Sequence, residues 1–362
     1  MRIAIDARAA AEVPAGRGRY VRELLRGLAR LEADHEYVLY ARTRWEDALL
    51  DSRFQWRTPS APSLSWPLLA GAQMSRGADV ALASTSYAMT IPWRIPGAAI
   101  VWDFAPFDRS LKPPRGSLLE RATLPIAVRR CERLIAISEA TRQELVERFP
   151  SARSKATVAY PAADVHFTPE AGAGDEAVLE RQGLRHPYVL VTGTLEPRKN
   201  LPRLIEAFAG LDERVRRGWT LALAGAAGWE TDSTFASVAA HGELVRTLGY
   251  VPEEELACLY RQAGVFCYVS LYEGFGIPVL EAMQSGTPVL TSSVSSMPEV
   301  GGDAARYADP HDVGDIRRAL GELLEDPELR ARCSTAGVAR AALFDWNVTA
   351  QTVLTALEQL VE

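Results

Sequence analysis

Short apolar segments alternate with longer amphipathic ones along most of the chain. In the first half, runs of apolar and β-branched residues predict strands at Arg2–Asp6, Tyr37–Tyr40, Ala98–Trp102, Arg133–Ile137 and Ala156–Ala159. Apolar residues at helical spacing between these runs predict helices at Gly18–Leu31, Gly116–Arg130 and Glu139–Phe149. Strands that alternate with helices are typical of parallel sheets joined by right-handed crossovers.

The second half repeats the pattern. It predicts strands at Tyr188–Thr192, Thr220–Ala224, Val265–Val269 and Val289–Thr291. It predicts helices at Leu201–Ala209, Glu253–Ala263, Pro278–Gln284 and Asp315–Leu324. We therefore expect an α/β fold built from two doubly wound, Rossmann-like domains.

A polar stretch rich in glycine, alanine and proline, Thr168–Glu176, separates the two halves and predicts a linker. At 362 residues the chain is long enough for two hydrophobic cores. We expect a first domain over residues 1–170, a second over residues 177–345, and a terminal helix over residues 346–362 that crosses back toward the first. Two such domains would face each other across a central cleft, where ligands commonly bind.

Charge is distributed unevenly between the halves. Residues 1–170 carry 24 basic and 19 acidic residues, a net charge of +5, whereas the remainder carries 16 and 27, a net charge of −11. The basic half indicates an acidic acceptor or an anionic membrane surface, or else ordinary solvated faces. No apolar run approaches the ~18 residues of a membrane span. The absence of a secretory segment and the four cysteines in core-like contexts predict a cytoplasmic protein with reduced thiols.

The stretch SLYEGFGIPVLEAM places Glu273 and Glu281 on either side of a glycine-rich turn. This turn follows a predicted strand, and the carboxyl ends of strands are where open α/β sheets bind ligands. Gly274 and Gly276 would let the backbone approach a ligand, and free amides at the start of the next helix, near Pro278, would favour an anion. Two acids placed only to complement a helix dipole are the alternative. The turn between them favours a site for a polyhydroxylated, phosphate-bearing ligand.

The segment GTLEPRKN, residues 193–200, follows the first strand of the second half and precedes a helix. Arg198 and Lys199 provide two adjacent cations there. A leaving nucleoside diphosphate gains negative charge, which fixed cations and helix amides can neutralise without a metal. An Arg–Lys pair in isolation is usually a solvated face, but its place between strand and helix favours a phosphate-binding loop.

Two motifs of the first half lie in corresponding places. AGRGRY puts Gly16 and Gly18 between the first strand and the first helix, where they either approach a diphosphate or form an ordinary turn and cap. VWDFAPF puts Trp102 and Asp103 at the end of a strand, where Trp102 either lines a site or packs in the core. The five histidines lack metal-ligand spacing and no DxD pair occurs, so we expect no metal and no other cofactor.

Taken together, these segments resemble the retaining GT-B glycosyltransferases of family 4, which include sugar-nucleotide mannosyl- and glucosyltransferases. The resemblance covers nearly the whole chain, in the order AGRGRYVRELLRGLARL, RLIAISEATRQEL, VAYPAAD, GTLEPRKNLPRLIEAF, LGYVPEEELACLYRQA and YEGFGIPVLEAMQSGTPV. The last segment contains the E-x7-E motif, which is the family's most specific mark.

The resemblance implies that the second domain binds most of the donor nucleotide and that the first binds the acceptor. It implies that Arg198 and Lys199 contact the diphosphate, that Glu281 contacts the ribose, and that Glu273 faces the donor sugar. We assign Glu273, Arg198 and Lys199 to catalysis and the following residues to donor binding: Gly16, Gly18, Trp102, Asp103, Gly193, Gly274, Phe275, Gly276, Ile277 and Glu281. The resemblance further implies retention without a metal, with the leaving phosphate helping to deprotonate the acceptor hydroxyl.

The expected activity is transfer of a hexose, from a donor of the GDP-mannose type, to a glycan or lipid-linked acceptor in cell-surface polysaccharide or glycoconjugate synthesis. The expected partners are this donor and acceptor, and we expect no nucleic acid. Two alternatives use the same fold: a sugar-nucleotide epimerase and a non-catalytic sugar-nucleotide-binding protein.

One position departs from the family pattern. The family often has a histidine before the aspartate that matches Asp103, and this histidine contacts the donor sugar, whereas this chain has Trp102. An indole would change that subsite, for example toward a 6-deoxy sugar, or else Trp102 lies off the site and packs. A separate feature is the basic helix Leu111–Arg130, with Lys112, Arg115 and several leucines, which predicts at most a peripheral, salt-sensitive contact with an anionic membrane at the inner face.

Overall fold

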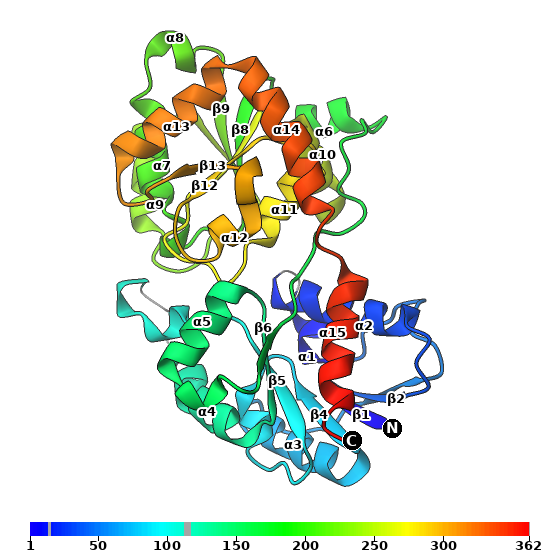
Figure 1. The fold of residues 1–362 in the computed structure, drawn as a ribbon. Coiled ribbons are helices and arrows are strands. Elements are labelled where there is room, and N and C mark those ends of the chain that lie inside the picture. The colour runs from blue at the N-terminus through cyan, green and yellow to red at the C-terminus, as the bar shows by residue number, and fades with distance from the viewer. Residues whose placement is uncertain (14–15, 112–116, 362) are drawn as a thin grey trace. The chain divides into compact units, whose positions relative to one another are not determined.

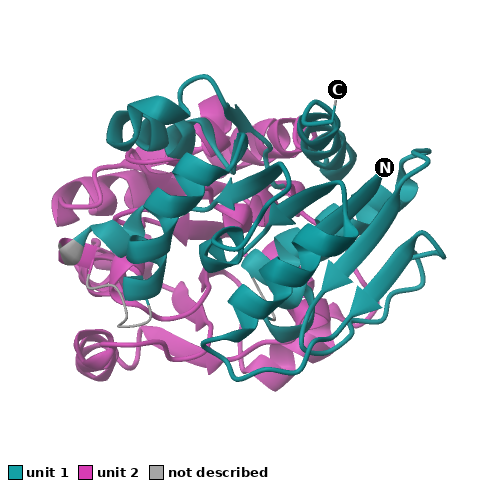
Figure 2. Cartoon of the chain, turned by 90° about the horizontal axis from the view of Figure 1, so that it is seen from below, with its two compact units in different colours: residues 1–108, 113–161, 345–362 teal, residues 109–112, 162–344 magenta. Residues whose placement is uncertain are grey.

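The computed structural model describes residues 1–13, 16–111 and 117–361, which divide into two compact units (Figure 1). Unit 1 comprises Met1–Asp108, Pro113–Pro161 and Asp345–Glu362, and unit 2 comprises Arg109–Lys112 and Ala162–Phe344. Figure 2 colours unit 1 teal and unit 2 magenta. The main crossing from unit 1 to unit 2 follows Pro161, and the chain returns to unit 1 after Phe344.

A seven-stranded parallel sheet forms the centre of the described part of unit 1, in the order β3-β2-β1-β4-β5-β6-β7. Its strands are β1 (Arg2–Asp6), β2 (Glu36–Tyr40), β3 (Phe54–Arg57), β4 (Val80–Ala83), β5 (Gly97–Val101), β6 (Arg133–Ala136) and β7 (Ala156–Val158). The central strands are buried on both faces, which explains their continuous apolar runs. The strand order reverses beside β1, between β1 and β4, as in other doubly wound sheets.

Helices cover both faces of this sheet (Figure 1). They are α1 (Arg8–Glu12), α2 (Arg17–Arg30), α3 (Trp66–Gly77), α4 (Ser117–Arg130), α5 (Glu139–Arg148) and α15 (Trp346–Glu358), with 3-10 turns η1 (Tyr87–Thr90), η2 (Ala105–Phe107) and η4 (Pro150–Ala152). The C-terminal helix α15 packs on α2, where a Cβ on Gly27 would lie 2.6 Å from the Ala350 Cβ. The close approach of the two helices therefore depends on the missing side chain.

Unit 2 has a six-stranded parallel sheet in its described part, in the order β10-β9-β8-β11-β12-β13. Its strands are β8 (Tyr188–Thr192), β9 (Thr220–Ala224), β10 (Val245–Gly249), β11 (Val265–Tyr268), β12 (Val289–Ser292) and β13 (Arg306–Ala308). The order reverses between β8 and β11, which corresponds to β1 and β4 of unit 1. The two parallel sheets confirm the expected α/β fold of two Rossmann-like halves.

The helices of unit 2 follow its strands in alternation. They are α6 (Asp175–Gln182), α7 (Leu201–Ala209), α8 (Glu213–Arg216), α9 (Asp232–Ala240), α10 (Glu253–Gln262), α11 (Ile277–Gln284), α12 (Met297–Gly301), α13 (Val313–Glu325) and α14 (Pro327–Ala341), with 3-10 turns η3 (Arg109–Leu111), η5 (Pro197–Lys199) and η6 (Gly302–Ala304). α7 and α13 pack on one face of the sheet around Leu204, Phe208 and Leu320, which are fully buried.

The predicted linker Thr168–Glu176 is wrong, because the chain crosses between the units after Pro161 and the whole stretch belongs to unit 2. α6 begins at Asp175, whose buried carboxylate accepts hydrogen bonds from Arg261 Nε at 2.7 Å and Gln262 Nε2 at 2.8 Å. The preceding residues also pack on unit 2, where Gln284 Nε2 donates to the carbonyl oxygen of Phe167 at 2.9 Å. The composition of the stretch did not reveal these partners, because they lie about a hundred residues further along the chain.

Candidate functional site

The two main motifs of the second half meet at one edge of the unit 2 sheet. Residues 193–200 follow β8 and residues 269–276 follow β11, and these strands are neighbours where the strand order reverses. Both loops therefore leave the carboxyl ends of adjacent parallel strands, which is where open α/β sheets bind ligands. The Leu271 amide donates to the Arg198 carbonyl at 2.8 Å, so the loops are tied together by the backbone.

The loop after β8 is held in a fixed shape. Gly193 has a φ of 110°, which a residue with a side chain rarely adopts. Asn200 adopts the left-handed conformation, with a φ of 61°, immediately before α7. Its side-chain Nδ2 donates to the carbonyls of Val269 at 3.1 Å and Pro310 at 2.7 Å. Asn200 thereby fixes the end of the loop that carries Arg198 and Lys199.

Glu273 lies between these two cations. Lys199 Nζ donates to Glu273 Oε1 at 2.7 Å, and Arg198 Nη1 pairs with Glu273 Oε2. Only 7% of Glu273 and 8% of Lys199 is exposed, so the charges are largely removed from water. Arg198 also pairs with Glu196, and Lys199 also donates to the Tyr268 hydroxyl. The structure thus brings together all three residues that we assigned to catalysis.

The cluster has a defined protonation pattern. Burial would raise the pKa of Glu273, but the positive charges of Arg198 and Lys199 outweigh it and lower the pKa to about 2. Burial and the charge of Arg198 lower the pKa of Lys199. Burial raises the pKa of Glu196 despite the nearby cations. Glu273 is therefore a carboxylate at neutral pH, which suits it to stabilise positive charge and not to donate a proton.

The turn after Glu273 leads directly into α11. Gly276 has a φ of 121°, and a Cβ there would lie 2.5 Å from the Met297 Cε. Gly274 and Phe275 precede it, and α11 begins at Ile277, so Pro278 takes the second helical position and not the first. Ser296 Oγ donates to the carbonyls of both Glu273, at 3.0 Å, and Phe275, at 2.6 Å, which leaves the backbone of this turn tightly held.

Glu281 has different surroundings from Glu273. It lies in the second turn of α11, is 2% exposed, and accepts a hydrogen bond from the Tyr260 hydroxyl at 2.9 Å. The same hydroxyl lies 2.7 Å from Thr192 Oγ1, at the end of β8. The two acids of the motif thus have separate partners, one a pair of cations and the other a neutral phenol.

The predicted residues of unit 1 occupy the corresponding edge of its sheet. Gly16 has a φ of 54° and caps α2. A Cβ on Gly18 would lie 1.8 Å from the Val13 carbonyl oxygen, so Gly18 is required where the end of α1 packs on α2. Asp103 follows β5 and its Oδ1 accepts from the Ala105 amide at 3.0 Å. Ala15, which opened the predicted motif, lies outside the described residues.

Trp102 is mostly buried, with 5% of its surface exposed. Its Nε1 donates to the Ser84 carbonyl at 2.8 Å, and its ring packs edge-on against Tyr20, with centroids 5.1 Å apart. The guanidinium of Arg17 lies over the indole, 5.5 Å from its centroid. These contacts favour the alternative in which the Trp102 indole packs in the core. The Arg17 side chain above it is more exposed than the indole.

Sequence reasoning missed several residues of both edges. The polar network of unit 2 also includes Tyr268, Glu196 and Tyr260, each of which lies within or beside one of the predicted motifs. In unit 1 the buried carboxylate of Asp6, at the end of β1, accepts from Thr85 Oγ1 at 2.8 Å and from the amides of Thr85 and Ser86. Its position at the carboxyl end of a predicted strand could have identified Asp6 as a candidate site residue.

His166 is brought between two carboxylates, although the histidine spacing gave no such indication. Asp164 lies 2.9 Å from its Nδ1 and Glu253 lies 3.6 Å from its Nε2. Asp164 lies within hydrogen-bonding distance of Nδ1, whereas Glu253 is too far from Nε2 for a hydrogen bond. One potential ligand atom from each of the three residues lies within 4.8 Å of the other two. We assign the trio to the packing of residues 162–167 on α10.

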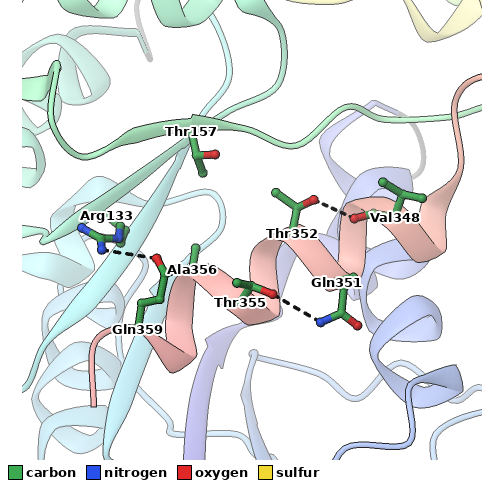
Figure 3. Close-up of a pocket in the computed structure, with 8 residues that line it drawn as sticks. All are labelled: Arg133, Thr157, Val348, Gln351, Thr352, Thr355, Ala356 and Gln359. Atoms are coloured by element: carbon green, nitrogen blue, oxygen red, sulfur yellow. Dashed lines mark hydrogen bonds between the residues drawn. The ribbon is translucent and has the colours of Figure 1, made fainter. Parts of the chain in front are cut away.

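A pocket of about 380 Å³ lies along α15 in unit 1 (Figure 3). Its lining residues are Arg133, Thr157, Val348, Gln351, Thr352, Thr355, Ala356 and Gln359. Arg133 donates to Gln359 Oε1 at 3.3 Å across its end. None of the predicted site residues lines this pocket. Within residues 1–13, 16–111 and 117–361, no helix is both long enough and apolar enough to cross a membrane.

Two family models match the chain in succession. The model described as "Glycosyltransferase Family 4" matches residues 14–167, and the one described as "Glycosyl transferases group 1" matches residues 180–340. Among solved structures, the Anabaena protein HepE in complex with UDP-glucose matches with a TM-score of 0.80, 18% identity, and coverage of 99% of this chain and 100% of that one. This likeness shows the GT-B fold.

Two mannosyltransferases are similar to part of the chain. O-antigen chain mannosyltransferase B of Escherichia coli is 38% identical over 224 residues, which is 61% of this chain and 59% of that protein. The MMP alpha-(1->4)-mannosyltransferase of Mycolicibacterium hassiacum is 32% identical over 233 residues, which is 62% of this chain and 54% of that protein. The chain thus spans little more than half the length of these relatives.

Proposed function

Because the chain belongs to the family 4 glycosyltransferases and has their GT-B fold, we propose that it transfers a hexose from a nucleoside diphosphate sugar to an acceptor hydroxyl, with retention. The two mannosyltransferase relatives favour a mannose donor of the GDP-mannose type. The O-antigen relative favours a glycan or lipid-linked acceptor in cell-surface polysaccharide synthesis.

The observation that carries this proposal is the placement of Glu273 between Arg198 and Lys199 at the ends of β8 and β11. A diphosphate bound here meets two cations that are already fixed in place, so little reorganisation is needed as its charge grows. The ionised Glu273 then lies where positive charge develops on the donor sugar. Neutralisation by these side chains takes the place of a divalent metal, so a chelator should leave the rate unchanged.

The proposed reaction proceeds on one face of the sugar. The bond between the anomeric carbon and the diphosphate oxygen breaks, and a bond to the acceptor oxygen forms on the same side. The acceptor proton passes to the departing phosphate oxygen, because Glu273, paired with two cations, is a poor base. Glu273 acts by charge and by holding Arg198 and Lys199 in position.

The other predicted residues keep their proposed roles in donor binding. Glu281, held by Tyr260, would accept from the ribose hydroxyls. The backbone of Gly193 and of the turn Gly274–Ile277 would approach the diphosphate and the sugar, since a glycine has no side chain to hold a ligand away from the backbone. Gly16, Gly18, Trp102 and Asp103 of unit 1 are the further proposed contacts or supports of the substrates.

A donor panel tests this function. GDP at about one hundred times its dissociation constant should stabilise the folded chain by about 2.7 kcal/mol, raising Tm by several degrees more than UDP, dTDP or ADP do. Incubation with GDP-mannose and a mannose-terminated glycan should give an elongated glycan. Transfer from GDP-mannose would also rule out a subsite restricted to 6-deoxy sugars. An isomerised donor would indicate the epimerase instead, and binding without turnover would indicate a silent binding protein.

Peripheral membrane contact is proposed for α4. Its Leu118, Leu119 and Ile126 are exposed beside Arg129, and Pro125 does not interrupt the helix. The predicted contributions of Lys112 and Arg115 lie outside the described residues. The four unpaired, buried cysteines favour the cytoplasmic side.

We expect the chain to sediment with phosphatidylglycerol vesicles at low salt and to be released at high salt. Changing both Leu118 and Leu119 to glutamine should weaken binding about tenfold or more, because two exposed apolar side chains are lost. Leu343→Gln, which changes a leucine of unit 2 that is more exposed than either of these, is the control. Absence of wild-type binding at low salt would contradict the proposal.

A further inference from the structure

Arg17 is a partly exposed cation at the edge of unit 1 where the strands of its sheet end. It is the first residue of α2, and its guanidinium lies over the Trp102 indole. It forms a two-point pair with Glu120 of α4, with Nη2 3.1 Å from Oε2 and Nη1 bonded to Oε1. The pair joins residues that are 103 positions apart in the sequence. About a third of the Arg17 side chain and a quarter of the Glu120 side chain remain exposed.

Helix stability does not explain a cation at this place. The first turn of a helix carries a partial positive charge and favours acidic residues, yet the first turn of α2 contains none. An ion pair exposed to this extent adds little to folding stability. The combination of an unfavourable helix position with a precise two-point pair indicates that the groups serve an external ligand.

The support beneath Arg17 is rigid. The Trp102 indole is fixed by its bond to the Ser84 carbonyl and by the edge of Tyr20. The loop that carries Ser84 is in turn held by the buried carboxylate of Asp6. These parts come from the ends of β1, β4 and β5, which are adjacent strands at the point of order reversal. A side chain packed on such a platform is held ready for a ligand.

The local charge points to the class of ligand. Asp103 as well as Glu120 interacts electrostatically with Arg17, so one cation faces two carboxylates. Tyr87, which adjoins them, stays neutral because burial raises its pKa. This excess of negative charge disfavours a phosphate or a uronate. A sugar hydroxyl both donates and accepts, so neighbouring hydroxyls match an exposed guanidinium and carboxylate side by side.

We propose that Arg17 and Glu120, supported by Trp102, form a subsite of unit 1 that binds the hydroxyls of an uncharged acceptor sugar and rejects anionic ones. The assignment rests on the proposed transferase function and specifies its acceptor.

The test compares methyl α-mannoside with its 6-phosphate, which has the same pyranoside ring and carries a negatively charged phosphoryl group on O6. Binding of each to the full chain, saturated with GDP, is measured by saturation-transfer NMR, and GDP binding is measured by thermal shift. Wild type should bind the neutral glycoside at least tenfold better than the phosphate. Arg17→Gln should weaken the neutral glycoside about tenfold and leave the GDP shift unchanged. Glu120→Gln should raise the relative affinity for the phosphate about tenfold.

Two further variants separate binding from structure. The charge swap of Arg17→Glu with Glu120→Arg rebuilds an ion pair, so a merely structural pair would regain wild-type behaviour, whereas the subsite should not regain glycoside binding. Arg318→Gln, which removes an exposed Arg from a surface pair with Glu322, is the control.

The proposal is overturned if Arg17→Gln loses the GDP shift, if glycoside binding is unaffected in both single variants, or if wild type prefers the phosphate. Because these are binding measurements, failure of sugar transfer would refute the proposed function without deciding this one.

Discussion

Glu273→Gln should lower kcat by about 10³-fold while nucleoside diphosphate affinity changes by no more than about threefold. Glutamine has the same shape and can still accept from Lys199, so the loop should keep its position. What disappears is a full negative charge in a site with little water, where such a charge stabilises a developing cation strongly. The measurement is the initial rate of transfer from GDP-mannose, together with GDP titration by thermal shift.

A matched control for Glu273→Gln is Glu322→Gln. Glu322 also pairs with two cations, Arg306 and Arg318, but does so at the surface. Its variant should retain wild-type kcat, since removal of an exposed pair affects neither the strand ends nor the donor. A Glu273→Gln enzyme with more than a tenth of wild-type kcat would show that the carboxylate does not act on the reacting sugar.

Lys199→Met should lower kcat/KM by about 100-fold and also abolish most of the GDP-induced thermal shift. Methionine fills a similar volume, but it removes the ammonium group that donates to Glu273 and to the Tyr268 hydroxyl. The diphosphate then loses a cation both when it binds and when it leaves, so affinity and rate fall together. This pattern distinguishes Lys199 from Glu273, whose loss should affect kcat alone.

Lys155→Met provides the comparison within the described residues. Lys155 donates to the carbonyls of Val128 and Cys131 in unit 1. Its variant should lose stability because those carbonyls lose their donor, yet it should keep the GDP shift. If Lys199→Met kept a wild-type GDP shift, Lys199 would be a structural partner of Glu273 and not a diphosphate ligand.

The central strands and the helix after each motif could be predicted from the sequence because burial on both faces gives long apolar runs. β1, β8 and β9 begin and end where the apolar pattern predicts. The edge strands β3, β10 and β13 were missed, because an edge strand has one exposed side and its residues, such as those of VRTLG, read as polar. β4, with the sequence VALA, was also missed, although all four of its residues are buried.

The candidate site was partly predictable for a related reason. Arg198, Lys199 and Glu273 lie in two loops whose place at strand ends follows from the strand–turn–helix pattern, so their proximity follows from the order of adjacent strands. The pair of Arg17 and Glu120 was not predictable, because nothing in the local sequence of either residue indicates a partner on another helix. The sequence showed that Trp102 departs from the family pattern. Only the fold shows that its indole N–H donates to the carbonyl of Ser84.

The anomeric configuration of the sugar released from the donor shows whether transfer at Glu273 proceeds with retention, and its measurement requires no knowledge of the acceptor. GDP-α-mannose is incubated with the full chain, and slow transfer to water is followed by proton NMR, with Glu273→Gln as the comparison. We expect α-mannose to appear first and its release to depend on Glu273. Initial release of β-mannose, or an isomerised nucleotide sugar with no release of GDP, would contradict it.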